Sequence, residues 1–233
     1  MNMTPDDMVF ARWGPVVLNM TIAATWAVVL LLTIGSWLVT RRLSTATQIS
    51  RWQHVLEVIV LGMQQQIREV SRQEPGAYLP FVGTIFLFLA VSALLSVVPG
   101  IEPPTASLST TAALAACVFI AVPLFGIQRG GVRAYLRQYA EPTFFMLPFN
   151  IIGELSRTLA LAVRLYGNMM SGSVIVAILL GFAPLFVPVV LQLFGLLTGM
   201  IQAYIFSILA MVYIASATQA HREEPQPTHS EGD

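Results

Sequence analysis

Long apolar segments dominate the sequence and limit the folds that it can adopt. A transmembrane helix needs about 20 mainly apolar residues to cross a hydrocarbon core of roughly 30 Å. Five segments reach that length, at about residues 14–40, 78–98, 105–127, 147–181 and 184–219. Only 10% of the 233 residues are charged, whereas soluble domains carry about 25%. We therefore predict an all-α integral membrane protein with five transmembrane helices, the first retained because no small-residue cleavage pattern follows it.

The segment between the first two predicted spans, residues 48–72, has a different pattern. Its unbroken apolar stretch is too short to cross a membrane. Apolar side chains recur at helical spacing, and charged and polar side chains lie mostly on the other side. The apolar set is Trp52, Leu56, Val60, Met63, Ile67 and Val70, and the polar set is Arg51, His54, Glu57, Gln65, Arg68 and Glu69. This pattern favours an amphipathic helix on the membrane surface, and the alternative is a helix packed against the spans.

Arginine residues set the expected orientation, because cytoplasmic loops are enriched in positive charge. The loops after the first and third spans are rich in arginine, as at Arg41, Arg42, Arg129 and Arg133, and the opposite loops carry only Arg12. We expect the N-terminus outside and the C-terminus in the cytoplasm. Residues 1–220 are predicted to form one membrane domain, and residues 221–233 a polar, disordered cytoplasmic tail.

Composition argues against several classes of function. The net charge is zero, which gives no case for nucleic acid as a partner. Cys117 is the only cysteine, and His54, His221 and His229 lie outside the long apolar segments, so neither a metal site nor a bound cofactor is expected. The phosphate-binding pattern GxxxxGK[ST] does not occur, so any nucleotide chemistry belongs to other chains.

The last two predicted spans are unusually long and are joined by the turn GFAPLFVP. A helix of 35 residues extends about 52 Å, well beyond the apolar thickness of a bilayer. We expect these two helices to form a hairpin that tilts strongly, bends, or lies partly along the membrane against a large partner.

An arginine without a nearby acid lies within the fourth span, in the stretch LALAVRLYGNMMSG. Arg164 has no Asp or Glu within nine residues, and Glu154 is about 15 Å away along the helix axis. An arginine at mid-bilayer costs about 3 kcal/mol on insertion scales. We expect its partner to be a carboxylate of another chain. The alternative is a structural arginine hydrogen-bonded to Gln202 and to backbone carbonyls.

Polar and small residues accompany this arginine on both long helices. Arg157, Leu161, Arg164, Asn168 and Ser171 share a helical face. On the last helix, Gln192, Gln202 and Tyr213 share another, beside a ladder formed by Gly195, Gly199, Ala203, Ser207 and Ala210. Such surfaces are typical of wet or closely packed regions, not of regions that face lipid.

An arginine at this position is suited to control ion binding by a carboxylate that moves past it. Its side chain keeps its charge at physiological pH. A carboxylate beside it stays ionised because the opposite charge lowers its pKa, whereas a carboxylate that faces lipid is driven to bind a proton. A moving carboxylate would therefore release and take up an ion each time it passed, and the fixed charge would block direct leakage between two half-pathways.

Three segments resemble a known family, subunit a of the membrane sector of F-type ATP synthases. RLYGNMMSG and IQAYIFSILAMVYIASA are similar to its two signature segments, and PPTASLSTT, residues 103–111, is similar to the start of its next helix. The resemblance implies a multi-pass protein of a bacterial plasma membrane. It also implies three kinds of partner: a ring of c subunits facing Arg164, subunit b together with other synthase subunits, and the lipid bilayer.

The same resemblance implies roles for individual residues. Arg164 corresponds to the essential arginine, with Asn168 and Gln202 as polar neighbours. Glu154 would line the inner half-channel, and Tyr213 shares the polar face of the last helix. Candidates for the outer half-channel are Ser107, Ser109, Ser171, Ser173, Gln192 and Thr198.

The sequence also departs from the family pattern. Many relatives carry a Glu/His pair in the outer half-channel, where this chain has Ser173 and Gly195. Ser107 and Ser109 stand where Asp and Asn are common, and Thr158 replaces a frequent proline. We interpret the chain as a divergent member, of the kind expected from an alternative ATPase operon, in which water held by hydroxyl and amide groups serves the outer path. Protons are the favoured ion and sodium is the alternative.

Two other classes of function are alternatives to this one. A small secondary transporter could bind an anionic substrate at Arg164, but such proteins favour two similar halves with broken helices, which the sequence does not show. An assembly or anchoring protein would explain the small-residue ladder but not the isolated arginine.

Overall fold

The computed structural model describes residues 9–13, 16–41, 51–72, 74–98, 103–132, 146–181 and 187–219. The fold is helical apart from a short N-terminal hairpin, in which β1 (Val9–Trp13) pairs antiparallel with β2 (Val16–Asn19). The sequence analysis did not predict this hairpin and started the first span at residue 14. Helix α1 (Met20–Thr40) begins later, because the β-branched pair Val16 and Val17 belongs to a strand.

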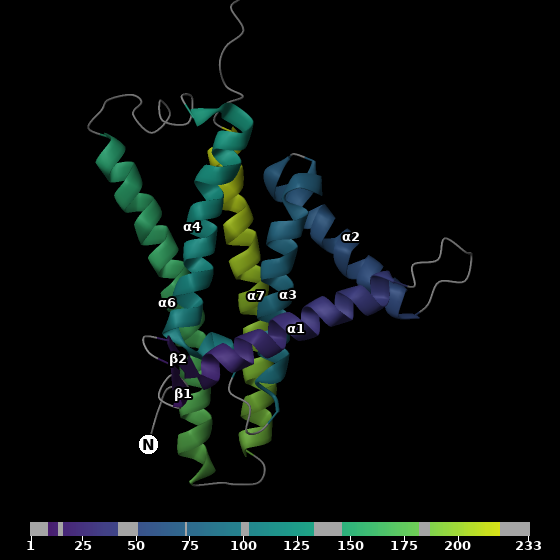
Figure 1. Cartoon of the computed structure of the whole chain (residues 1–233), viewed down its shortest axis with the longest axis vertical. Helices are drawn as coiled ribbons and strands as arrows, with labels where there is room; N and C mark the ends of the chain where they lie inside the picture. The colour runs from purple at the N-terminus through teal and green to yellow at the C-terminus, as the bar shows by residue number, and fades with distance from the viewer. Residues whose placement is uncertain are drawn as a thin grey trace, which may run out of the picture.

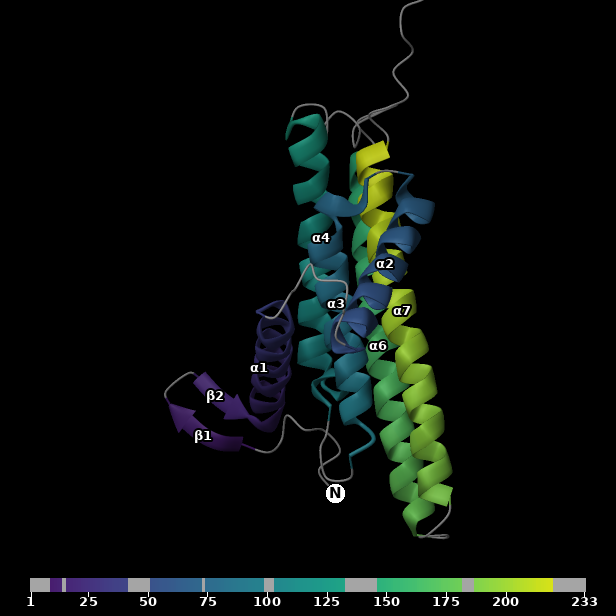
Figure 2. The same ribbon diagram turned by 90° about the vertical axis from the view of Figure 1, so that its right-hand side faces the viewer.

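Four helices form an elongated bundle, and their bounds are close to the predicted ones. They are α3 (Leu79–Leu95), α4 (Leu108–Gly130), α6 (Met146–Leu180) and α7 (Val187–Gln219). Figures 1 and 2 show these helices running alongside one another with successive helices in opposite directions, while α1 crosses the bundle at a steep angle. Helix α4 ends where Gly131 adopts a φ of 78° and its N–H donates to the Ile127 carbonyl.

Among the described residues, α1, α4, α6 and α7 are long and apolar enough to cross a membrane. The predicted span at 78–98 is a helix only over the 17 residues of α3, about 26 Å in length. A short turn follows, in which the Val97 and Val98 amides donate to carbonyls three residues back. A fifth span at α3 is therefore not confirmed and stays a prediction, and the structure supports a multi-pass helical membrane protein.

The amphipathic segment forms α2 (Arg51–Ser71), which packs against α7 and α3. Ile67 is buried in this contact, and the Tyr204 hydroxyl of α7 donates to Gln66 Oε1 at 2.8 Å. Val58 and Leu61 on the same helix remain exposed. The alternative of a helix packed against the spans thus describes its second half, and a position on the membrane surface stays a prediction.

The two long helices are confirmed as long, with 35 residues in α6 and 33 in α7. Figure 1 shows both continuing past the ends of α3 and α4. They pack against each other, most closely toward the turn that joins them (Figure 1), and α7 also contacts α3, α4 and α2. Helices α2, α3 and α4 therefore pack against this pair.

The small-residue ladder of α7 is a packing surface. Ala203, Ser207 and Ala210 are buried, and so is Gly199. A Cβ placed on Gly199 would lie 3.0 Å from Ala93 Cβ of α3 and 3.1 Å from Met169 Cε of α6. Three helices thus meet at Gly199, where the absence of a side chain lets them approach closely.

Gly199→Ala should therefore destabilise the bundle by about 1–3 kcal/mol, because the added methyl group overpacks a closed contact. The matched control is Gly195→Ala one turn away, where an added Cβ meets nothing within 4 Å. That variant should be neutral or stabilising by up to about 1 kcal/mol through helix propensity. Thermal unfolding of the detergent-solubilised protein measures both, and equal melting temperatures for the two variants would contradict this packing.

Candidate functional site

Arg164 lies near the middle of α6, and its side chain is exposed. In the part of the chain that the structure describes, Arg164 makes no hydrogen bond and no ion pair. The alternative of a structural arginine bonded to Gln202 therefore finds no support in these contacts. Leu161 and Leu165, on either side in sequence, are buried in the core. The helical face that Arg164 shares with Leu161, Asn168 and Ser171 thus lies at the edge of the packed side of α6. Leu161 points into the core, and Arg164 points outward.

The surface around Arg164 is apolar and open to approach. Val163 and Leu159 are largely exposed, and so are Leu155 and Ile152 further along α6. Gly167, one turn from Arg164, is exposed and has open space where a Cβ would point. A cation set in an exposed apolar surface with a glycine beside it is suited to receive another helix.

The polar neighbours predicted for Arg164 lie in different environments. Asn168 is half-buried and Ser171 is exposed, both on the side of α6 that carries Arg164. Gln202 is only 6% exposed and lies in the interior of the bundle. Asn168 and Ser171 therefore share the side of α6 that carries Arg164, whereas Gln202 belongs to the buried interior of the bundle.

The candidates for the outer half-channel lie either on the two long helices or at the start of α4. The hydroxyls of Ser171, Ser173 and Thr198 donate to carbonyls of their own helices, and Gln192 is half-buried on α7. Ser107 is buried at the start of α4, where its side chain caps the helix by accepting from the Ser109 amide at 3.2 Å. The Ser107 and Ser109 hydroxyls are 2.6 Å apart.

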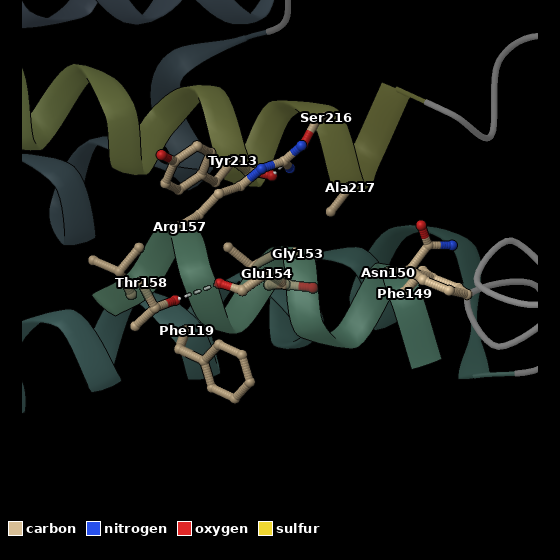
Figure 3. Close-up of a pocket in the computed structure, with 12 residues that line it drawn as sticks. Phe119, Phe149, Asn150, Gly153, Glu154, Arg157, Thr158, Tyr213, Ser216 and Ala217 are labelled. Carbon is tan, nitrogen blue, oxygen red and sulfur yellow. Dashed lines mark hydrogen bonds between the residues drawn. The ribbon is translucent and has the colours of Figure 1, made fainter. Parts of the chain in front are cut away.

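A pocket of about 400 Å³ opens between α4, α6 and α7, toward the C-terminal end of α7. Glu154, Arg157 and Thr158 line it from α6, and Tyr213 and Ser216 from α7. Figure 3 shows Arg157 extending from α6 toward Tyr213 and Ser216, and its guanidinium carbon lies 5.8 Å from the centre of the Tyr213 ring. The Thr158 hydroxyl donates to the Glu154 carbonyl at 3.0 Å. Sequence reasoning named Glu154 and Tyr213 separately, and the fold brings them to one cavity.

Sequence reasoning missed two buried hydroxyl groups, Ser92 on α3 and Thr105 in η3 (Pro104–Ala106). Their Oγ atoms, together with Gln202 Nε2, are buried without a hydrogen-bond partner. The available signal was a lone serine in the apolar stretch FLFLAVSALL. Within the described ranges, no group of three or more His, Cys, Asp or Glu side chains is placed to hold a metal ion. His221 and His229 lie outside these ranges.

Comparison with known proteins identifies the family. The family model described as ATP synthase A chain matches residues 22–215. The chain is 61% identical to ATP synthase subunit a 2 of Acaryochloris marina, over 97% of both chains. It is also 61% identical to ATP synthase subunit a 1 of Chlorobaculum parvum, over 96% of this chain and 99% of that one. Albidiferax ferrireducens has an ATP synthase subunit a that is 57% identical over 97% of this chain. The chain therefore belongs to the ATP synthase subunit a family, as its three motifs predicted.

Proposed function

We propose that this chain is the ion-translocating stator subunit of a rotary ATP synthase, in which Arg164 faces the carboxylates of a rotating ring of c subunits. The observation that carries the proposal is the state of Arg164. This arginine is exposed at the middle of a long apolar helix and has no bonding partner in the described part of the chain. An arginine at that depth costs several kcal/mol unless an acid or water compensates its charge.

The ring would supply that acid. A carboxylate that rotates through lipid carries its ion, because desolvation favours the neutral form. Beside Arg164 the carboxylate becomes ionised and releases the ion, because the guanidinium stabilises the negative charge. Since Arg164 keeps its own charge, it separates the entry path from the exit path. A membrane potential adds about 2.3 kcal/mol per charge per 100 mV to the driving force.

The inner half-channel is assigned to the pocket between α4, α6 and α7. Its lining residues precede Arg164 along α6 and lie near the C-terminal end of α7, the end that we expect to face the cytoplasm. Its lining combines a carboxylate, Glu154, with the Tyr213 and Ser216 hydroxyls. Such groups can hold water and exchange ions with it.

The outer half-channel is assigned to the other side of Arg164. Its candidates are Ser107, Ser109, Ser171, Ser173, Gln192 and Thr198, and Asn168 and Gln202 are the proposed polar neighbours of the arginine. All carry neutral oxygen or amide groups, so ions would pass through held water without a titratable relay in α6 and α7. We propose protons as the coupled ion, with sodium as the alternative, since the ion-binding carboxylate belongs to the ring.

The hairpin of α6 and α7 is assigned to the ring surface. Its helices are longer than a bilayer requires, and a strong tilt around the ring accommodates that excess. A secondary transporter has no specific observation in its favour, because family membership covers nearly the whole chain. The N-terminus is proposed to lie outside and the C-terminus in the cytoplasm, following the arginine bias.

Arg164→Gln should abolish ATP-driven ion pumping by the assembled complex in proteoliposomes, because the ring carboxylates lose the charge that ionises them. Assembly should persist, since the Arg164 side chain makes no bond within the described chain. The control is Arg68→Gln, which neutralises an exposed arginine on α2 and should pump normally. Normal pumping by the Arg164→Gln complex would refute the mechanism.

A cysteine at Gly167 should crosslink to the ring. Gly167→Cys in a Cys117→Ser background, loaded with a thiol-reactive photocrosslinker, should capture a small subunit whose helix carries a carboxylate. Mass spectrometry identifies the captured chain. The comparison is the unaltered chain, in which the probe sits on the exposed Cys117 of α4. Adducts with lipid alone from position 167 would count against a ring at this surface.

ATP-driven transport in proteoliposomes distinguishes protons from sodium as the coupled ion. If protons are coupled, ATP-driven acidification of proteoliposomes should proceed at the same rate with and without sodium. Uptake of radioactive sodium that requires ATP, together with acidification that fails without sodium, would instead establish sodium as the coupled ion.

A further inference from the structure

A second pocket, a groove of about 220 Å³, opens between α2, α3 and α7. Helix α2 lies at an angle to α3 and α7 (Figure 1), and all three helices contribute side chains to the groove. Some of the lining is buried, namely Ile67 of α2, Val82 of α3 and Met211 of α7. Gly62 of α2 and Tyr204 of α7 belong to the same lining and are exposed, so the groove opens onto the surface of the protein.

The polar groups in this lining are bonded within the chain. The Tyr204 hydroxyl donates to Gln66 Oε1 at 2.8 Å, and the Ser207 hydroxyl donates to the Ala203 carbonyl at 2.9 Å. In the described part of the chain, none of the buried side-chain atoms that lack a hydrogen-bond partner lines the groove. Buried water needs about two to four polar partners, and a polar ligand needs free donors or acceptors to orient it. The lining therefore favours a hydrocarbon.

The surroundings of the groove can supply a hydrocarbon. The chain is a multi-pass membrane protein, and Val58, Val60 and Leu61 of α2 present exposed apolar side chains at or near the groove. An amphipathic helix at a membrane places its apolar side at the boundary between headgroups and acyl chains. Met63 and Ile67, from the apolar side of α2, line the groove. Acyl chains of the bilayer are therefore the apolar molecules that can reach it.

The volume of the groove fits part of one acyl chain. An apolar protein cavity of about 150 Å³ holds a benzene molecule, so 220 Å³ holds roughly eight carbons of a hydrocarbon chain. A helix with its side chains is about 10–12 Å across and is too large for this space. A Cβ placed on Gly62 would meet nothing within 4 Å, so the groove is open there. Met63 and Met211 in the lining are flexible and can adapt to the bound chain.

We propose that this groove binds one acyl chain of a bilayer phospholipid, and that the bound chain links α2 to α3 and α7. In the groove the chain contacts side chains of three helices at once, and these dispersion contacts are collectively strong. The bound lipid therefore exchanges more slowly than the lipid around it. The inference involves neither Arg164 nor the ion path, so it stands or fails independently of the proposed function.

A phospholipid with a photoreactive diazirine in its acyl chain tests this site. The assembled complex is reconstituted in vesicles of phosphatidylethanolamine and phosphatidylglycerol that contain this lipid. The complex is then extracted in detergent, washed to remove rapidly exchanging lipid, and illuminated. Mass spectrometry of its peptides locates the adducts. Adducts on Met63, Phe86 and Ile208 of the groove should exceed those on the exposed Leu30 and Leu38 of α1 by about fivefold or more.

Gly62→Leu should fill the groove with its own side chain and lower the adducts there by about fivefold or more. The matched control is Gly35→Leu, which places the same side chain at an exposed position of α1. An added Cβ at Gly35 also meets nothing within 4 Å, and this variant should keep the labelling of the unaltered complex.

Adducts spread evenly over the groove and the exposed residues of α1 would overturn the inference, and so would groove labelling that Gly62→Leu leaves unchanged. If Gly62→Leu does not assemble, the adduct map of the unaltered complex decides the question. A partner polypeptide in the groove is tested with the photoreactive residue benzoylphenylalanine at Val58. Crosslinks from this position to another subunit, without lipid adducts, would also overturn the inference.

Discussion

The rest of the structure depends on the cost of holding a permanent positive charge in apolar surroundings. Arg164 is exposed near the middle of α6, among exposed Val163 and Leu159, and the described part of the chain offers it no acid. Such a charge is tolerated only where water or an opposite charge can reach it. The chain is a multi-pass membrane protein whose relatives are subunits of ATP synthases. Under the proposed function, the acid that compensates this charge belongs to a neighbouring subunit.

Close packing behind the arginine keeps that surface in place. Gly199, Ala203, Ser207 and Ala210 let α7 approach α3, and Gly199 also meets Met169 of α6. Association of helices in lipid relies on such van der Waals contacts, because apolar side chains gain nothing by leaving lipid for protein. Close packing at Gly199 thus helps to hold α6, which carries Arg164, against α7 and α3.

Polar groups lie on the outer surface of α6, between the helices and in the pocket near the C-terminal end of α7. Those on the outside of α6, such as Ser171 and Ser173, satisfy their hydroxyls within their own helix. Those between the helices, such as Ser92 and Gln202, have donors without an acceptor among the described residues. On the other side of Arg164, a pocket collects Glu154, Arg157 and Tyr213. The proposed pair of half-channels assigns these two polar regions to opposite sides of Arg164.

The sequence by itself determined the helical class, the amphipathic α2, the long α6 and α7 pair and the family, because apolar length, helical periodicity and extended motifs are local properties. It also identified Arg164 as unpaired, since no acid lies at its depth. Its fifth span, at α3, is not confirmed, and it did not anticipate the N-terminal hairpin. Only the tertiary structure decided which neighbours each polar group has. It turned Gln202 inward, brought Glu154 and Tyr213 to one pocket, and left Ser92 and Thr105 with buried donors, because such relations depend on helix rotation and crossing, which spacing along one helix does not specify.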